Sequence, residues 1–437
     1  MSMRARVFLP LCALLVGTTA VGSPLEIEHW TLANGARVYL VETRAIPMVQ
    51  LRTVFDAGAV RDPQGRRGVA LLTSAMLEEG TEKLSGDEIA RRFETLGAEF
   101  GATAERDTAT VDLRTLSDAK LLDPAIELYA QILASPNFPA ASLERERGRM
   151  LVAVQRDAQS PGSVASKAFY RELYREHPYA LDTQGDEASI KSISREDLVA
   201  HHKQYYVGKN AHLVIVGNVS KRQARKIAER VVGALPAGEA AAPIPGVPSL
   251  EEARDRNIDF AATQSHIFIG QPGMVRNDPD YFPLYVGNYI LGGGGLVSRV
   301  STEVREKRGL AYSAYSYFLP MRVAGPFILG LQTKNTQRQE AVALVRQVLK
   351  QFVEEGPTAE ELEAAKKHIT GAFPLRLDSN RKISDNLAVI AFYGLPLTWL
   401  DDYSKRVEAV TAEQIRDAFK RRVNPDRLVT LVVGGAR

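Results

Sequence analysis

Two hydrophobic patterns alternate along the chain. Short, continuous apolar runs at residues 210–217 and 428–434 predict buried strands. Capping-box signatures at residues 194–198 and 411–415 predict helix starts just before those strands. An Asn-Gly pair at residues 34–35 predicts a tight hairpin. Because strands come in antiparallel pairs followed by helices, we expect an α+β fold with helices packed on mainly antiparallel sheets.

The order of predicted elements occurs twice. Ser194 and Thr411 open the two capped helices, and the separation between them is almost the same as that between the pairs Asp62-Pro63 and Asp278-Pro279. Three further pairs of features have similar separations. They are predicted helices at 118–133 and 336–352, strand-like stretches at 103–116 and 311–333, and the pairs Leu143-Glu144 and Leu362-Glu363. A nearly constant separation predicts two homologous domains.

A proline-rich stretch separates the two halves. Residues 236–248 hold four prolines, which exclude a helix or a central strand. We therefore expect a semi-extended linker at 236–256, between domains at 23–235 and 257–437.

The first residues are typical of a secretory signal peptide. Arg4 and Arg6 precede an apolar run at 7–16, and small residues follow at 17–23. Ten apolar residues are too few to span a membrane, so we expect cleavage after Gly22 and secretion into a bacterial periplasm. Cys12, the chain's one cysteine, lies within this segment and lacks the setting of a lipoprotein cysteine.

Composition excludes several classes of protein. The 437 residues are 45% hydrophobic and 24% charged, as in ordinary globular proteins. The net charge is +3 without a basic run, so a nucleic-acid partner is not expected. No later stretch reaches 18 apolar residues, so we expect no membrane attachment once the signal is removed.

Several motifs together resemble the M16 family, which includes pitrilysin, insulinase and mitochondrial processing peptidase. The first half carries GAVRDP at 58–63, GVALLTSAMLEEGT at 68–81 and HPY at 177–179. The second half carries NYILGGGG at 288–295, SRV at 298–300 and REKRGLAY at 305–312. The resemblance extends over residues 25–435 and implies two homologous domains in this chain, and a proteolytic chamber formed where two such two-domain chains close on each other like a clam shell.

The zinc motif of active M16 members is missing. Those members carry His-x-x-Glu-His on the helix that begins at residue 68, with both histidines on one helical face and the glutamate as general base. The matching positions are Leu71, Ser74 and Ala75. The third ligand would match Ala153, or Val152 by a different spacing. The resemblance therefore implies that this chain binds no zinc.

No other set of histidines replaces the motif. No pair has the i, i+4 spacing that places two ligands on one helical face. Packing or surface roles are expected for all seven: His29, His177, His201, His202, His212, His266 and His368.

Other family positions are kept in the second half. The resemblance implies that Arg305 and Tyr312 hold the substrate's carbonyl groups, with the tyrosine stabilising the oxyanion of a peptide bond under attack. Gly292, Gly293, Gly294 and Gly295 match a glycine-rich loop that admits substrate, although a simple flexible turn explains them as well. They lack the Lys-Ser/Thr of a phosphate-binding loop.

Peptide docking in the first domain is not expected. Active members add a peptide to the edge of the strand that matches residues 99–104. Their Asn-Ala-x-Thr pattern is replaced here by Gly101-Ala102-Thr103-Ala104.

The sequence leaves several functions open. We expect a subunit that is inactive alone and forms a heterodimer with a zinc-bearing M16 chain, supplying Arg305 and Tyr312 for cleavage of peptides or unfolded polypeptides. The alternatives are a structural or binding homologue without proteolysis, a homodimeric peptide binder or chaperone, and an independently active peptidase. The peptide sequence that is cleaved and the partner's identity are not encoded in any recognisable motif.

Overall fold

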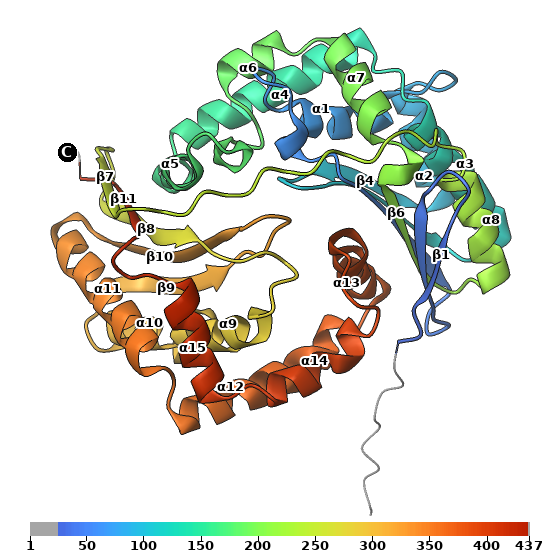
Figure 1. Ribbon diagram of the computed structural model, residues 1–437. Coiled ribbons are helices and arrows are strands. Elements are labelled where there is room, and N and C mark those ends of the chain that lie inside the picture. The colour runs from blue at the N-terminus through green and yellow to red at the C-terminus, as the bar shows by residue number, and fades with distance from the viewer. Residues whose placement is uncertain (1–24, 436–437) are drawn as a thin grey trace, which may run out of the picture.

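The computed structural model describes residues 25–435 as two α+β lobes, which confirms the expected fold class. Figure 1 shows the lobes side by side, the first running from blue to green and the second from yellow to red. The signal-peptide prediction for residues 1–22 lies outside the described residues. No helix in the described part is long and apolar enough to cross a membrane.

The first lobe is built on a six-stranded sheet with the order β1-β2-β6-β3-β5-β4. Among these described strands only the β2–β6 pair is parallel. The strands are β1 (Glu28–Thr31), β2 (Arg37–Glu42), β3 (Met48–Phe55), β4 (Glu99–Ala104), β5 (Ala109–Leu116) and β6 (Ala211–Gly217). The helices are α1 (Val69–Met76), α2 (Gly86–Leu96), α3 (Ala119–Ala134), α4 (Ala140–Ala158), α5 (Pro161–Tyr174), α6 (Glu187–Ser192), α7 (Arg195–Tyr205) and α8 (Lys221–Val231).

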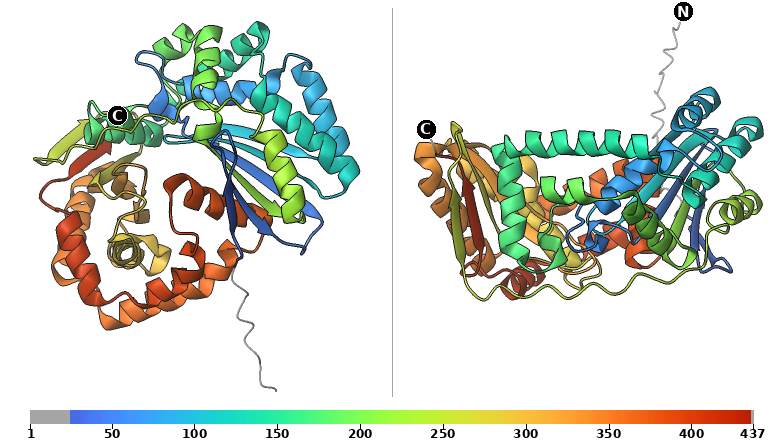
Figure 2. Two further views of the ribbon diagram at one scale, coloured as in Figure 1. Left: turned by 45° about the vertical axis from the view of Figure 1, so that its right-hand side comes forward. Right: turned by 90° about the horizontal axis from the view of Figure 1, so that it is seen from above.

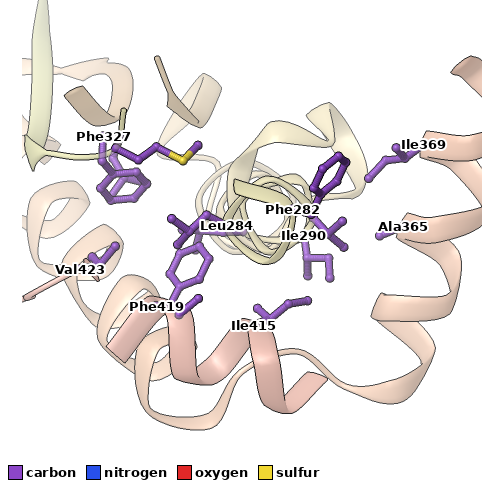
Figure 3. Close-up of a cluster of buried hydrophobic side chains, with 14 of the residues drawn as sticks. Phe282, Leu284, Ile290, Phe327, Ala365, Ile369, Ile415, Phe419 and Val423 are labelled. Carbon is purple, nitrogen blue, oxygen red and sulfur yellow. The ribbon is translucent and has the colours of Figure 1, made fainter. Parts of the chain in front are cut away.

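The second lobe has five described strands in the order β7-β11-β8-β10-β9, which repeats the first sheet without a counterpart of β1. Strands β7 and β11 form the one parallel pair between the strands described. The strands are β7 (Arg254–Ile258), β8 (Gln264–Pro272), β9 (Ala311–Phe318), β10 (Pro326–Lys334) and β11 (Val429–Val433). The helices are α9 (Tyr281–Asn288), α10 (Arg299–Ser301), α11 (Arg338–Glu355), α12 (Ala359–Ala372), α13 (Asn380–Tyr393), α14 (Trp399–Glu408) and α15 (Ala412–Arg422). Figure 3 shows part of its core, where Leu284 of α9 faces Phe419 of α15 and Phe282 lies on the side of Ile369 of α12.

The repeat in the sequence is present in the structure. Helices α7 and α15 have the same length, and both start with the expected capping box, at Ser194 and Thr411. Helices α5 and α13 also match each other in length. Each follows the helix that carries a repeated Leu-Glu pair, α4 in the first half and α12 in the second, so α5 and α13 are equivalent elements.

These two equivalent helices are exchanged between the lobes. Helix α5 comes from the first half of the chain but packs on β8 and β11 of the second sheet. Helix α13 comes from the second half but packs on β3 and β6 of the first. Figures 1 and 2 show α13 lying against the sheet of the first lobe.

The exchange explains why the central strands are buried on both faces. Every residue of β6 is buried. Its side chains alternate, so Leu213 and Ile215 join the core of their own lobe, whereas Val214 and Val216 belong to a cluster with the second lobe. Strand β11 behaves in the same way, with Leu431 and its neighbours packing on α5. An antiparallel sheet commonly leaves one face to solvent, but here the exchanged helices cover it.

The linker is held against the first lobe. Gly208 N donates to Pro236 O at 2.7 Å, Arg61 Nη1 donates to Ala242 O at 2.7 Å, and His177 Nε2 donates to Pro245 O at 2.9 Å. Residues 236–253 form no helix or strand. Strand β7 begins at Arg254, within the range 236–256 that we assigned to the linker.

Leu173→Ala tests the helix exchange. Leu173 of α5 is 3% exposed and belongs to a cluster with residues of β11. We expect the free energy of unfolding to fall by about 2–5 kcal/mol, because the substitution leaves a cavity between the lobes. Urea denaturation followed by circular dichroism measures this. Leu375, which is 64% exposed, is the control, and Leu375→Ala should change the value by less than about 0.5 kcal/mol. Equal effects would contradict the role given to α5.

Candidate functional site

The start of α1 is fixed by backbone geometry and by one carboxylate. Asp62 accepts hydrogen bonds from Gly68 N at 2.7 Å and Ala70 N at 2.8 Å. Burial raises the pKa of Asp62 to about 7. Gly68 has a φ of 97°, and a Cβ atom there would lie 2.7 Å from Gln184 O, so glycine is required. These constraints fix the position of the next turn of α1, which carries the positions of the missing zinc motif.

None of the three motif positions on α1 can bind a metal. Leu71 and Ala75 are half-buried and carry no ligand atom. Ser74, at the position of the general base, is buried, and its Oγ lies 3.1 Å from Tyr206 Oη, just after α7. The hydroxyl that replaces the base is therefore engaged inside the lobe and not free to take a proton from water.

The position of the third ligand is equally inert. Val152 of α4 is 66% exposed, whereas Ala153 is half-buried. Helix α4 packs beside α1. The half-buried Ala153 is thus the better match to a residue facing α1, and neither side chain has an atom that can coordinate zinc.

The adjacent histidines of α7 are engaged within the fold, His201 fully buried and His202 half-buried. His201 Nε2 donates to Ala57 O at 3.2 Å, and His202 Nε2 donates to Leu133 O at 2.9 Å. Burial lowers the pKa of both side chains to about 4. Within residues 25–435, no three His, Cys, Asp or Glu side chains gather as a group that could hold a metal ion.

The structure brings Arg305 and Tyr312 together. The Arg305 Cζ atom lies 4.9 Å from the centre of the Tyr312 ring, a cation–π contact. Among the described residues Arg305 forms no ion pair, and the nearby Glu303 binds Lys307 and Arg308. Tyr312 is 84% exposed. The guanidinium and the phenol are thus both free to donate hydrogen bonds to a ligand.

A β-bulge presents Tyr312. The pairing between β9 and β10 shifts by one residue, so that Tyr312 and Ser313 both lie opposite Gln332. Bulges occur often beside active sites, where they redirect a side chain. Arg305 lies in the π-helical segment η7 (Thr302–Glu306), which is another irregularity frequent at functional sites. Both residues therefore depend on local departures from regular structure.

The four glycines have different surroundings. Gly292 is buried, and a Cβ atom there would lie 2.4 Å from Ser316 Oγ of β9, so its role includes close packing. Gly293 and Gly295 are exposed, and Gly295 has a φ of 65°. Leu296 and Val297, directly after the glycines, are also exposed. The run thus contacts the same strand that carries Tyr312. Its substrate-binding role remains a prediction.

Strand β4 is the edge of the first sheet, as expected for the strand that matches the family's docking strand. It pairs only with β5 among the described strands. Gly101 faces open space, with no atom within 4 Å of a Cβ built there.

A pocket that the sequence motifs did not identify lies at the other end of β9. A cavity of about 470 Å³ lies between α9, β9 and α12, lined by aromatic rings and two arginines, Arg276 and Arg376. Gly293 also lines it. The sequence does hold one indication of this pocket. Tyr281, Tyr285 and Tyr289 recur every four residues and so form a stripe on one helical face.

Comparison with protein families gives two matches that cover most of the chain. Residues 37–187 match the family described as Insulinase (Peptidase family M16). Residues 192–369 match the family described as Peptidase M16 inactive domain. The motif resemblance is thereby confirmed in both halves.

Individual relatives agree with these matches. The crystal structure of a peptidase M16 inactive domain from Pseudomonas fluorescens is 39% identical, covers 94% of this chain and 99% of its own, and superimposes with a TM-score of 0.91. A protein named non-peptidase homolog YmxG from Helicobacter pylori is 27% identical over 98% of both chains. A probable mitochondrial-processing peptidase subunit beta from Schizosaccharomyces pombe is 27% identical over 83% of this chain and 81% of its own.

His202→Gln tests the neutral state of the half-buried His202, which lies on α7 beside α1. The pKa of His202 falls from 6.5 in the unfolded chain to about 4 in the folded one. The neutral ring therefore stabilises the fold above pH 6.5, and this stability is lost as the pH falls toward 4. We expect the free energy of unfolding to decrease between pH 7 and pH 4 by on the order of 3 kcal/mol more in the native chain than in the variant. Urea denaturation across this range measures it, and parallel profiles would contradict the interior, neutral state.

Proposed function

Because the chain belongs to the M16 family of peptidases, we propose that it is the zinc-free subunit of a two-chain peptidase. In this proposal it pairs with a zinc-bearing M16 chain and supplies Arg305 and Tyr312 to the reaction. The observation that carries the proposal is the cation–π pair between the half-buried Arg305 and Tyr312, which is 84% exposed, with no carboxylate partner for Arg305 in the described chain. The residues of α1 do not fit zinc, so no step of the reaction is assigned to a metal in this chain.

The two residues act on the peptide by hydrogen bonding. The Arg305 guanidinium carries five N–H donors, which suit the carbonyl oxygens of an extended peptide. The Tyr312 hydroxyl donates to the oxygen that becomes negative when the peptide carbonyl is attacked. Contact with Arg305 limits the orientations of the Tyr312 ring, which reduces the reorganisation needed as charge develops. The zinc of the partner supplies the Lewis acid and the activated water.

A second candidate is a peptide-binding protein without proteolysis. It is favoured by the relative named a non-peptidase homolog, which matches nearly the whole chain. The exposed Tyr312 would then contact a ligand that is bound and released intact. The two candidates differ in whether a zinc-bearing partner exists.

The compartment belongs to the same proposal. The leader at residues 1–22 supports secretion of the chain to a bacterial periplasm, where it would meet its partner and peptides or unfolded polypeptides.

Metal analysis tests the prediction that α1 binds no zinc. We expect the purified chain to retain far less than one zinc ion per molecule after dialysis, because Leu71, Ser74 and Ala75 provide no ligands. Inductively coupled plasma mass spectrometry measures the ratio. One tightly held zinc per chain would refute the alignment of α1 with the family motif.

Tyr312→Phe tests the catalytic contribution. The tagged full-length chain is purified with its zinc-bearing partner, and cleavage of an unfolded peptide is followed with and without this chain. We expect Tyr312→Phe to lower kcat by about 10²–10³-fold, the usual effect of removing one oxyanion donor. Arg305→Ala should also lower turnover while the complex still assembles.

The control is Tyr315→Phe, which removes a hydroxyl from the same strand and should leave turnover unchanged. Full activity of Tyr312→Phe would remove the proposed role. Absence of any zinc-bearing partner would favour the non-proteolytic candidate.

A further inference from the structure

The pocket between α9, β9 and α12 has an unusual charge. Two arginines and a histidine line it, and no aspartate or glutamate is among its described lining residues. Arg276 forms no hydrogen bond or ion pair through its side chain within residues 25–435, and its Nε is buried without a partner. It lies between two rings, with its Cζ 5.5 Å from the centre of Tyr393 and 6.0 Å from that of Tyr281.

The second arginine has a different role. Arg376 Nη2 donates to Tyr285 Oη at 2.7 Å, and its Nη1 lies 3.4 Å from Tyr403 Oη. Its donors therefore fix the ring of Tyr285, which stacks on Tyr281 at 6.0 Å. Arg276 is left as the guanidinium whose donors are free within the described chain, while Arg376 positions the aromatic wall.

This arrangement suits a carboxylate attached to an aromatic or apolar group. A guanidinium binds a carboxylate through two parallel hydrogen bonds. The Nη groups of Arg276 are not among the buried unpaired atoms and donate to no group within residues 25–435, so their donors are open to an anionic ligand. The rings of Tyr285, Tyr289 and Tyr317 offer flat apolar surface for the rest of the ligand.

A peptide is favoured over a small free acid by what lies next to the pocket. Gly293 of the predicted substrate loop lines it, and the exposed Leu296 and Val297 follow directly. Tyr312 and Phe318 lie near the two ends of β9, a separation of roughly 20 Å along a strand. An extended peptide of about that length can reach from Tyr312 to the pocket.

We propose that this pocket binds the C-terminal residue of a peptide, with its carboxylate on Arg276 and an aromatic or apolar side chain against the tyrosines. This inference rests on the proposed function only for the idea that the chain handles peptides. Neither a partner nor zinc is needed for the binding itself.

The test is calorimetric titration of the full isolated chain with N-acetyl-Ala-Ala-Leu-Phe as the free acid and as the C-terminal amide. We expect the acid to bind about tenfold more tightly or better, because the amide loses the charge-assisted bonds. Arg276→Gln should abolish the difference, and Arg276→Lys should restore part of it. Arg406, which also stacks on aromatic rings but lies outside the pocket, is the matched control, and Arg406→Gln should bind like the native chain.

Three outcomes with the peptide pair would overturn the proposal. These are equal binding of acid and amide, an acid preference that survives Arg276→Gln, and no binding of either peptide at millimolar concentration. N-acetylphenylalanine distinguishes the source of the carboxylate, since binding as tight as that of the peptide would assign the pocket to a small aromatic acid instead. Circular dichroism verifies that each variant is folded.

The titration result can be distinguished from a test of the proposed peptidase function. The four-residue test peptide spans about 13 Å and does not reach Tyr312, so Tyr312→Phe should leave its binding unchanged even where it lowers turnover. An intact Tyr312 effect with no peptide binding here would overturn the pocket assignment alone.

Discussion

The structure depends on the exchange of two equivalent helices between its lobes. Helix α5 completes the second sheet and α13 completes the first, so neither sheet buries both faces with helices from its own half of the chain. Burial of alternate residues on β6 and β11 supplies the driving force, because each apolar side chain removed from water contributes about 1.5–3 kcal/mol. Directional hydrogen bonds also join the two halves of the chain. Asp107 of the first half accepts hydrogen bonds from Arg322 N and Tyr393 Oη of the second. Each lobe therefore depends on the other half of the chain for part of its core.

Within this fold, the residues that position the two halves of the family's site have been kept, but the zinc-binding side chains have not. Helix α1 keeps the elements that define its start, Asp62 and Gly68, although its ligand positions hold leucine, serine and alanine. Ser74 joins Tyr206 in the interior, so the position of the base has become part of the packing. In the second lobe, by contrast, Arg305 and Tyr312 remain at the surface, on a bulge and a π-helical segment that regular secondary structure would not provide.

Much of the fold could be predicted because it follows from local patterns and from repetition. The capping boxes at Ser194 and Thr411 and the apolar runs after them located α7, α15, β6 and β11. The exchange of α5 and α13 could not be predicted, since an amphipathic pattern shows that a face is buried but not which sheet covers it. The start of β7 at Arg254 was missed for a similar reason, because its polar residues pair through the backbone with β11.

Part of the candidate site could likewise be predicted from the sequence, and part required the structure. Motif positions identified Arg305 and Tyr312, but the contact between them and the exposure of the tyrosine required the structure. The pocket around Arg276 was not found, because its lining comes from segments far apart in the sequence, from Met274 to Arg376. Only the tyrosine stripe at residues 281–289 indicated it, and such a stripe is more often part of a core.

The most direct test of the central claim is a structure of the assembled two-chain complex with an uncleaved peptide bound. The account predicts that Tyr312 Oη lies about 3 Å from the carbonyl oxygen of the peptide bond nearest the partner's zinc. A complex in which Tyr312 faces solvent while the peptide occupies the partner's site would contradict it.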